Sequence, residues 1–175
     1  SAAVRSQIKK AVKLYFEFVN DQGAKQDNKR ESAMNVLSLF ANIGVAEAYL
    51  KEIGFNVVVA NELIERRAIL YSKIYPDTYM ICGDITDKKI FDKVVRESID
   101  RGVNIIMATP PCQGMSTVGQ KVVDDERNRL VCQVIEAIKE IKPKYSFIEN
   151  VPMFFNTKIK VGNDKILIPE LLENE

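Results

Sequence analysis

The segment TPPCQGMS, residues 109–116, places a cysteine directly after two prolines. Pro110 and Pro111 fix their backbone φ angles and carry no amide donor, and Gly114 follows closely, so the chain is predicted to bend sharply here. A cysteine that only fills a core needs apolar neighbours and no such frame. Cys112 is therefore a candidate nucleophile, and exposure together with the positive field of the amides that follow it would favour its thiolate.

The other two cysteines lie within apolar runs, Cys82 in YMIC and Cys132 in LVCQV, and are interpreted as inert core thiols. Three cysteines without CxxC spacing argue against a disulfide framework or a metal site, and they favour a reducing compartment. The sequence contains no histidine. This excludes catalytic pairs of serine or cysteine with histidine.

Glu149 also has unusual surroundings, because it directly follows the apolar run YSFI. A carboxylate at the end of a buried strand is unfavourable unless it is hydrogen-bonded or has a function. Cys112 and Glu149 are therefore the two candidate catalytic residues, and the elements before them must place both at one site.

Strand and helix patterns alternate along the chain after an N-terminal helix (8–19) and a polar linker (20–32). Residues 34–55 read as a strand, a loop and a helix that ends at Gly54. Further strands are predicted in 56–62, 78–87, 103–112 and 145–152, and further helices in 63–76, 88–102 and 128–143. This alternation predicts a doubly wound α/β fold with a mostly parallel sheet.

Ligands of such folds bind beyond the carboxyl ends of the strands, where this sequence places polar residues. The first strand ends in FANIG, residues 40–44, a turn with one glycine where dinucleotide-binding folds prefer three. Glu62 stands at the spacing of an acid that binds ribose hydroxyls, and Asp84 follows the third strand. An ordinary turn, a helix-capping glutamate and a turn aspartate are the simpler interpretations. Their joint position at successive strand ends favours a cofactor site.

In their order along the chain, these segments resemble the cytosine-5 DNA methyltransferases of restriction–modification type. LFANIGVAEAYL is similar to the family's cofactor motif, ANE to its ribose-binding acid, GDI to its adenine contact and PPCQGMS to its nucleophile motif. The resemblance covers about residues 34–156 and includes a Glu-Asn-Val motif. Pro-Cys-Gln and Glu-Asn-Val at this spacing are its most specific part.

The resemblance implies a Rossmann-like enzyme that transfers a methyl group from S-adenosylmethionine to carbon 5 of cytosine in double-stranded DNA. Cys112 would attack carbon 6 of a flipped cytosine, and Glu149 would hold the base at N3. Glu62 would bind the ribose of S-adenosylmethionine, and Asp84 and Ile85 would bind its adenine. The other residues implied at the cofactor cleft are Phe40, Ala41, Ile43, Gly44, Leu63, Pro111 and Leu130.

The chain also departs from the family's pattern. Asn42 and Val45 stand where glycine is usual, and Leu63 stands where an aromatic side chain often stacks on adenine. No Gln-Arg-Arg-like motif, target-recognition domain or closing Gly-Asn motif follows residue 156, so a fragment, a clipped product or one subunit of a split enzyme is expected.

The expected organisation is an N-terminal helix and linker (1–33), a cofactor-binding and catalytic domain (34–156) and the start of a further segment (157–175). In permuted members of the family the closing helix precedes the cofactor motif. Residues 3–19 are either that helix or a non-specific N-terminal helix.

Charge bears on the choice of partner. The net charge of +1 divides into +4 over residues 1–30 and −3 over the remaining 145. An acidic core is a poor surface for DNA, which agrees with a recognition domain elsewhere, in this chain's continuation or in a second polypeptide.

Three other functions fit parts of the sequence. The first is a non-catalytic cofactor- or partner-binding subunit of a split methyltransferase. The second is a tRNA cytosine-5 methyltransferase, although those relatives follow PPCQ with Pro-Phe-Thr where this chain has Gly-Met-Ser. The third is a dehydrogenase, in which PPCQ and ENV would have no role. The sequence shows no signal-peptide pattern at its start and no apolar run of about 20 residues, which predicts a cytoplasmic prokaryotic protein with no membrane partner.

Overall fold

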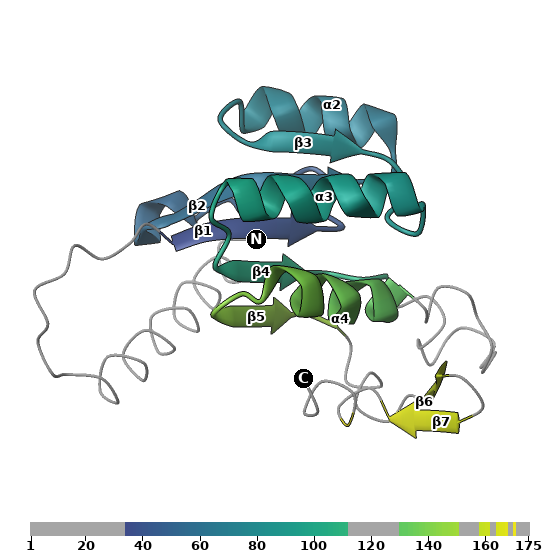
Figure 1. Cartoon of the computed structure of the whole chain (residues 1–175). Coiled ribbons are helices and arrows are strands. Elements are labelled where there is room, and N and C mark those ends of the chain that lie inside the picture. The colour runs from purple at the N-terminus through teal and green to yellow at the C-terminus, as the bar shows by residue number, and fades with distance from the viewer. Residues whose placement is uncertain (1–33, 112–129, 151–157, 162–163, 168–169, 171–175) are drawn as a thin grey trace, which may run out of the picture. The chain divides into compact units, whose positions relative to one another are not determined.

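The computed structural model describes residues 34–111, 130–150, 158–161, 164–167 and 170 (Figure 1). All of them belong to Ala33–Glu175, the second of two compact units of the chain. The helix expected at residues 8–19 and the linker that follows it lie outside the described residues.

Five parallel strands form the central sheet in the order β3-β2-β1-β4-β5. Their bounds are β1 Met34–Leu39, β2 Phe55–Glu62, β3 Tyr79–Cys82, β4 Ile105–Ala108 and β5 Tyr145–Ile148. The helices between them are η1 Lys51–Ile53, α2 Glu65–Ile74, α3 Lys88–Asp100 and α4 Leu130–Ile141. The doubly wound α/β fold predicted from the sequence is therefore confirmed.

Helices cover both faces of this sheet because successive strand residues point to opposite sides. On one face, Leu37, Val59 and Ile106 join Val94 of α3 and Val134 of α4 in the main core. Figure 1 shows α3 and α4 side by side in front of the strands. On the other face, α2 packs through Tyr71 against Ala41 and Ala60, and a smaller cluster surrounds Val36, Ile105 and Met107.

The prediction of a helix before Gly54 was wrong about the type of helix and about its length. Residues 42–50 form turns, and only the short 3₁₀ helix η1 follows them. The backbone bonds here run from an N–H to the carbonyl three residues earlier, as from Leu50 to Glu47 (3.0 Å) and from Ile53 to Leu50 (3.1 Å). Gly54 does end the segment, as predicted, and it adopts the left-handed conformation with φ 86°.

The prediction that Cys82 is a core thiol was also wrong. Cys82 is the last residue of β3 and is exposed, whereas the preceding Ile81 points into the core. Successive side chains of a strand point to opposite faces, so Ile81 is buried while Cys82, the last residue of β3, is exposed. Cys132 lies half-buried on α4.

Beyond the central sheet, β6 Lys158–Val161 and β7 Asp164–Leu167 pair as an antiparallel hairpin. The sequence predicted only the start of a further segment at these residues. None of the helices that the structure describes has both the length and the apolar character needed to cross a membrane.

Candidate active site

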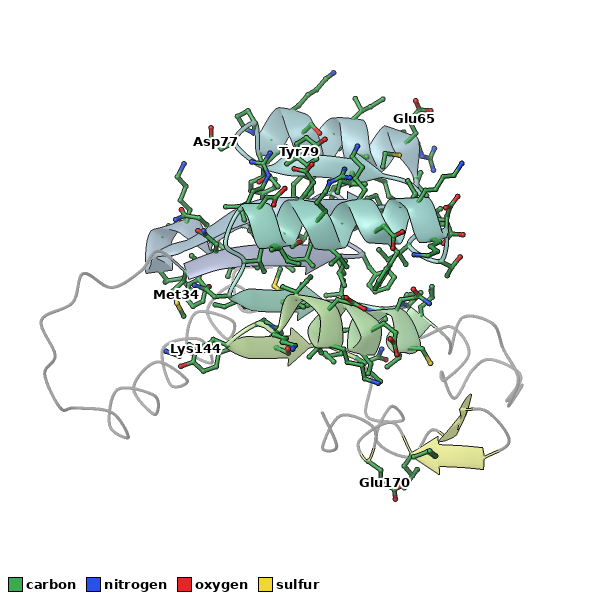
Figure 2. The ribbon with its side chains drawn as sticks, in the orientation of Figure 1. Met34, Glu65, Asp77, Tyr79, Lys144 and Glu170 are labelled. Carbon is green, nitrogen blue, oxygen red and sulfur yellow. The ribbon has the colours of Figure 1, made fainter. Side chains whose placement is uncertain are left out.

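The carboxyl ends of the parallel strands meet at one edge of the sheet, and the candidate residues follow these ends. In Figure 2, Glu65 at the start of α2 marks this edge. Met34 at the start of β1 and Lys144 just before β5 lie at the opposite edge. The parallel topology thus brings together residues that are far apart in the sequence.

The first loop, residues 40–44, has an uncommon backbone conformation. The φ angle is 60° at Phe40, 52° at Asn42 and 82° at Gly44, all in the left-handed region. Only glycine adopts this region freely, and a bulky residue such as phenylalanine rarely does so. A non-glycine residue held there costs about 1–3 kcal/mol, and such residues cluster at ligand sites. The conformation therefore marks this loop as a candidate binding element.

Glu62 fixes the first loop from the end of β2. Its side chain is 5% exposed, and its Oε2 accepts a hydrogen bond from the N–H of Asn42 (2.8 Å). Its Oε1 accepts from the N–H of Ile64 (2.9 Å), the N-cap residue of α2, and lies 3.7 Å from a guanidinium nitrogen of Arg67. Each carboxylate oxygen has two lone pairs, so Glu62 can accept further bonds from ligand hydroxyls.

The third strand end carries Asp84 and Ile85. The Asp84 carboxylate is exposed, and its Oδ1 accepts from the backbone N–H (2.9 Å) and the hydroxyl (2.8 Å) of Thr86. This is the turn-aspartate arrangement that the sequence allowed. Ile85 is 3% exposed and its side chain belongs to the main core, so only its backbone can face a ligand.

Two hydrogen bonds join the end of β5 to the end of β4, and a third joins the end of β4 to the first loop. The Glu149 N–H donates to the Ala108 carbonyl (3.0 Å), and the Asn150 side-chain amide donates to the Pro110 carbonyl (3.1 Å). The Thr109 hydroxyl donates to the Phe40 carbonyl (3.2 Å). The residues that lead to the proposed nucleophile are thus tied to both the exposed Glu149 and the first loop.

The remaining candidate residues differ in how exposed their side chains are at this edge of the sheet. Leu63 is 62% exposed, whereas Ala41 is buried against Tyr71 and can offer a ligand only its backbone. Ile43, Pro111 and Leu130 are half-buried. Cys112 lies outside the described residues. Among those that are described, no group of three acidic, cysteine or histidine side chains could hold a metal ion.

The thiol of Cys82 lies at the same edge, with Sγ 3.8 Å from the Leu63 carbonyl. Partial desolvation raises the pKa of this thiol, and the carboxylates of Glu65 and Glu62 raise it further. Its protonated form is therefore favoured. That Cys82 is inert in catalysis stays a prediction, and burial no longer argues for it.

Sequence reasoning missed a polar cluster beneath the first loop. The Ser38 hydroxyl donates to the Glu47 carboxyl group, which is 3% exposed, and the Tyr75 hydroxyl donates to the Gly44 carbonyl. Burial raises the pKa of Glu47. Tyr71 and Tyr75 lie four residues apart on one face of α2, a spacing that was visible in the sequence. Their partners were not visible.

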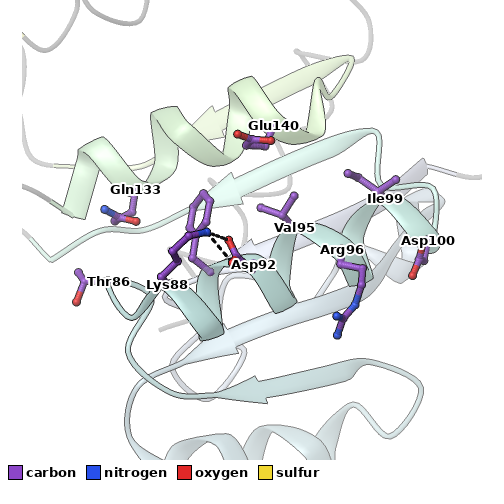
Figure 3. A pocket seen from close by; sticks show the side chains of 10 residues that line it. Thr86, Lys88, Asp92, Val95, Arg96, Ile99, Asp100, Gln133 and Glu140 are labelled. Carbon is purple, nitrogen blue, oxygen red and sulfur yellow. Dashed lines mark hydrogen bonds and ion pairs between the residues drawn. The ribbon is translucent and has the colours of Figure 1, made fainter.

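A groove of about 580 Å³ runs between α3 and α4, starting from Thr86 in the turn that follows β3 (Figure 3). Apolar side chains of Phe91, Val95 and Ile99 line it, and charged residues such as Glu140 border it. A bidentate ion pair between Lys88 and Asp92 neutralises part of its rim (2.7 and 2.8 Å). Since no candidate residue borders this groove, we do not assign it to the active site.

Comparison with known proteins identifies the family of this chain. Residues 34–170 match the family model for C-5 cytosine-specific DNA methylases. The chain is 43% identical over 144 residues to the Type II methyltransferase M1.HgaI of Avibacterium volantium, covering 79% of this chain and 40% of that protein. It is 31% identical over 121 residues to the Type II methyltransferase M.AgeI of Thalassovita gelatinovora, covering 67% and 28% respectively.

The fold is also found in a solved structure, that of a putative DNA modification methyltransferase encoded within an E. coli prophage. The TM-score is 0.56 at 26% identity, and the match covers 69% of this chain and 33% of that one. The chain thus spans less than half the length of each of these relatives. The parallel sheet, the strand-end residues and the family match over residues 34–170 together show that the chain belongs to the C-5 cytosine-specific DNA methylase family.

Proposed function

We propose that the protein containing this chain transfers a methyl group from S-adenosylmethionine to carbon 5 of cytosine in DNA, as the modification enzyme of a restriction system. The observation that carries the proposal is the hydrogen bond from Asn150 to the Pro110 carbonyl (3.1 Å). It ties the Glu-Asn-Val segment to the prolines that precede Cys112. A catalytic carboxylate and a nucleophile that act on one base require such proximity.

The described residues fit S-adenosylmethionine as the methyl donor. Glu62 offers carboxylate oxygens to ribose hydroxyls beside the first loop, and Asp84 offers an exposed carboxylate at the next strand end. The backbone of Ile85 would contact the adenine, and Leu63 would cover it with an exposed aliphatic side chain. Phe40, Ala41, Ile43, Gly44, Pro111 and Leu130 would complete the cleft.

S-adenosylmethionine supplies the methyl group, and the chain's own residues prepare the cytosine. The Cys112 thiolate forms a bond to carbon 6 of a cytosine flipped out of the duplex, which makes carbon 5 nucleophilic. Glu149 holds the N3 edge and favours its protonation as the ring accepts electron density. After methyl transfer, loss of the carbon 5 proton and expulsion of the thiolate restore the aromatic ring.

Recognition of the DNA sequence is assigned to residues beyond the family match, in the same polypeptide or in a second one. DNA is preferred over tRNA as the substrate because Gly-Met-Ser follows PPCQ and because the matching family is described as C-5 cytosine-specific DNA methylases. A cytoplasmic location follows from a DNA substrate in a prokaryotic cell.

The test is covalent trapping on a duplex whose target cytosine carries fluorine at carbon 5. Fluorine cannot leave as a proton does, so the adduct should persist through denaturation as a complex of increased mass. We expect the intact protein to form it in the presence of S-adenosylmethionine. Cys112→Ser should abolish it, because a hydroxyl group is a poor nucleophile without a nearby base.

The matched controls are Cys82→Ser and Cys132→Ser, which should trap as efficiently as the unmodified protein. An adduct that maps to Cys82 or Cys132, or one that survives Cys112→Ser, would refute the assignment of the nucleophile. Glu149→Gln should slow trapping at least tenfold without changing affinity for the cofactor, since it removes a contact to the base alone.

A further inference from the structure

Tyr75 joins the end of α2 to the first loop, across 31 positions of sequence. Its hydroxyl donates to the Gly44 carbonyl at 2.5 Å. Its ring occupies the space into which a Cβ at Gly44 would project. A tyrosine at this place therefore contacts Gly44 in two ways, by a hydrogen bond and by ring packing.

The position of Tyr75 is itself fixed by surrounding contacts. Its N–H donates to the Tyr71 carbonyl (2.8 Å), and its carbonyl accepts from the N–H of Thr78 (3.1 Å) in the turn before β3. Its ring packs against the buried ring of Tyr71, with centroids 4.8 Å apart. These contacts hold the Tyr75 side chain in the position from which its hydroxyl bonds to the first loop.

The hydroxyl is also held in the form that donates. Burial raises the pKa of Tyr75, and the negative charge of Glu47 raises it further. The phenol therefore stays protonated through neutral pH, and the bond to Gly44 is present under the conditions of catalysis.

The first loop needs such support because its backbone is unfavourable by itself. Phe40 and Asn42 adopt the left-handed conformation without being glycine. Glu62 holds the loop at Asn42 and Thr109 holds it at Phe40, which leaves Gly44 at the other end. Tyr75 supplies the side-chain bond at that end.

We propose that Tyr75 is a positioning residue, whose bond to the Gly44 carbonyl keeps residues 40–44 in the conformation that binds S-adenosylmethionine. This inference rests on the proposed function, which assigns the first loop to the cofactor. Tyr75 acts through the loop and does not itself contact the reacting atoms. When fewer molecules hold the competent conformation, the apparent affinity falls in proportion.

The experiment measures the affinity for S-adenosylhomocysteine by calorimetry on this chain and on Tyr75→Phe, which keeps the ring and removes the hydroxyl. We expect about fivefold weaker binding, the effect of losing one typical hydrogen bond. Tyr71→Phe is the matched control, because it keeps the ring that packs against Ala41 and removes a buried hydroxyl, one helical turn away, for which the structure shows no hydrogen bond. Its affinity should equal that of the unmodified chain.

Hydrogen exchange followed by mass spectrometry separates positioning from general stability. Tyr75→Phe should accelerate exchange in the peptide that contains residues 40–45 and leave the β4 and α3 peptides unchanged. Equal affinity of Tyr75→Phe and the unmodified chain would refute the inference alone, as would acceleration throughout the sheet. Failure of the unmodified chain to bind S-adenosylhomocysteine would instead refute the cofactor assignment.

Discussion

Glu62 shows how one side chain at this edge combines a structural contact with a proposed ligand contact. Its carboxylate accepts from the N–H groups of Asn42 and Ile64, so it ties the first loop to α2. Replacement by alanine would remove this tie together with any contact to a ribose. Loss of affinity in Glu62→Ala would therefore not by itself identify Glu62 as a ligand-binding residue.

The sequence predicted which residues follow the strand ends, but not what they contact there. Glu62, Asp84 and Glu149 were recognisable because each is a polar residue at or just beyond the end of an apolar run. Glu47 and Tyr75 were not, because their partners Ser38 and Gly44 belong to other elements of the fold. A buried carboxyl group on a segment with helical spacing resembles any solvent-facing glutamate in sequence.

Glu47 should make the chain less stable as the pH rises. Burial raises the pKa of its carboxyl group above the ordinary value of 4.5, so the folded state binds the proton more tightly than the unfolded state. Its contribution to stability is fully present below pH 4.5 and is lost as the pH rises toward the folded pKa. Glu47→Gln does not titrate and keeps an acceptor for the Ser38 hydroxyl.

We therefore expect the free energy of unfolding of Glu47→Gln to exceed that of the unmodified chain increasingly above pH 4.5. Within the window between the two pKa values, the gain is about 1.4 kcal/mol per pH unit. Urea denaturation from pH 4 to pH 8 measures it. The control is Glu140→Gln, the same substitution at an exposed position of α4. A difference for Glu47→Gln that does not vary with pH would contradict the prediction.

At the scale of elements, the alternation of strands and helices was readable because each helix buries one apolar stripe and each strand is nearly continuous in apolar residues. The segment before Gly54 was the exception. Helix propensities differ by at most about 0.7 kcal/mol per ordinary residue. The contacts from Glu47 to Ser38 and from Gly44 to Tyr75 fix both the start and the middle of this segment, and such long-range constraints override propensity.

Helix α3 offers a test of how local signals stabilise an element. Asp87 is its N-cap residue, and the carboxylate accepts from the N–H of Lys89 (2.8 Å). Asp87→Ala should lower the free energy of unfolding by about 1 kcal/mol, because it leaves a helix N–H without its acceptor. Urea denaturation at neutral pH measures the change.

The control on the same helix is Asp92→Ala, which removes the exposed ion pair with Lys88. Exposed pairs at this spacing contribute about 0.5 kcal/mol or less, so the effect should be the smaller of the two. Equal losses for the two variants would show that the carboxylate of Asp87 acts through general charge rather than as a cap.

At the scale of the whole molecule, the distribution of charge bears on DNA binding. Residues 1–30 carry a net charge of +4, whereas residues 31–175 carry −3. Affinity for DNA depends mainly on lysine and arginine contacts to phosphates and falls with salt in proportion to their number. DNA binding by the family therefore requires a basic surface, whereas the larger part of this chain is acidic.

We expect this chain alone to bind duplex DNA weakly and without sequence preference, with most of the affinity due to residues 1–30. Replacing Lys9, Lys10 and Lys13 by glutamine should weaken binding and reduce the salt dependence, by up to about 0.9 in the slope of log K against log salt per lost contact. Fluorescence anisotropy with two unrelated duplexes at several salt concentrations measures both effects.

The matched control replaces the three lysines of α3, Lys88, Lys89 and Lys93, by glutamine. Two of them are already engaged, since Lys88 pairs with Asp92 and the Lys93 ammonium lies 5.4 Å from the centre of the Tyr79 ring. Equal removal of charge should therefore change the salt slope less here than at the N-terminus. Sub-micromolar, sequence-selective binding by the unmodified chain at physiological salt would contradict the prediction, because it would place target recognition within these residues.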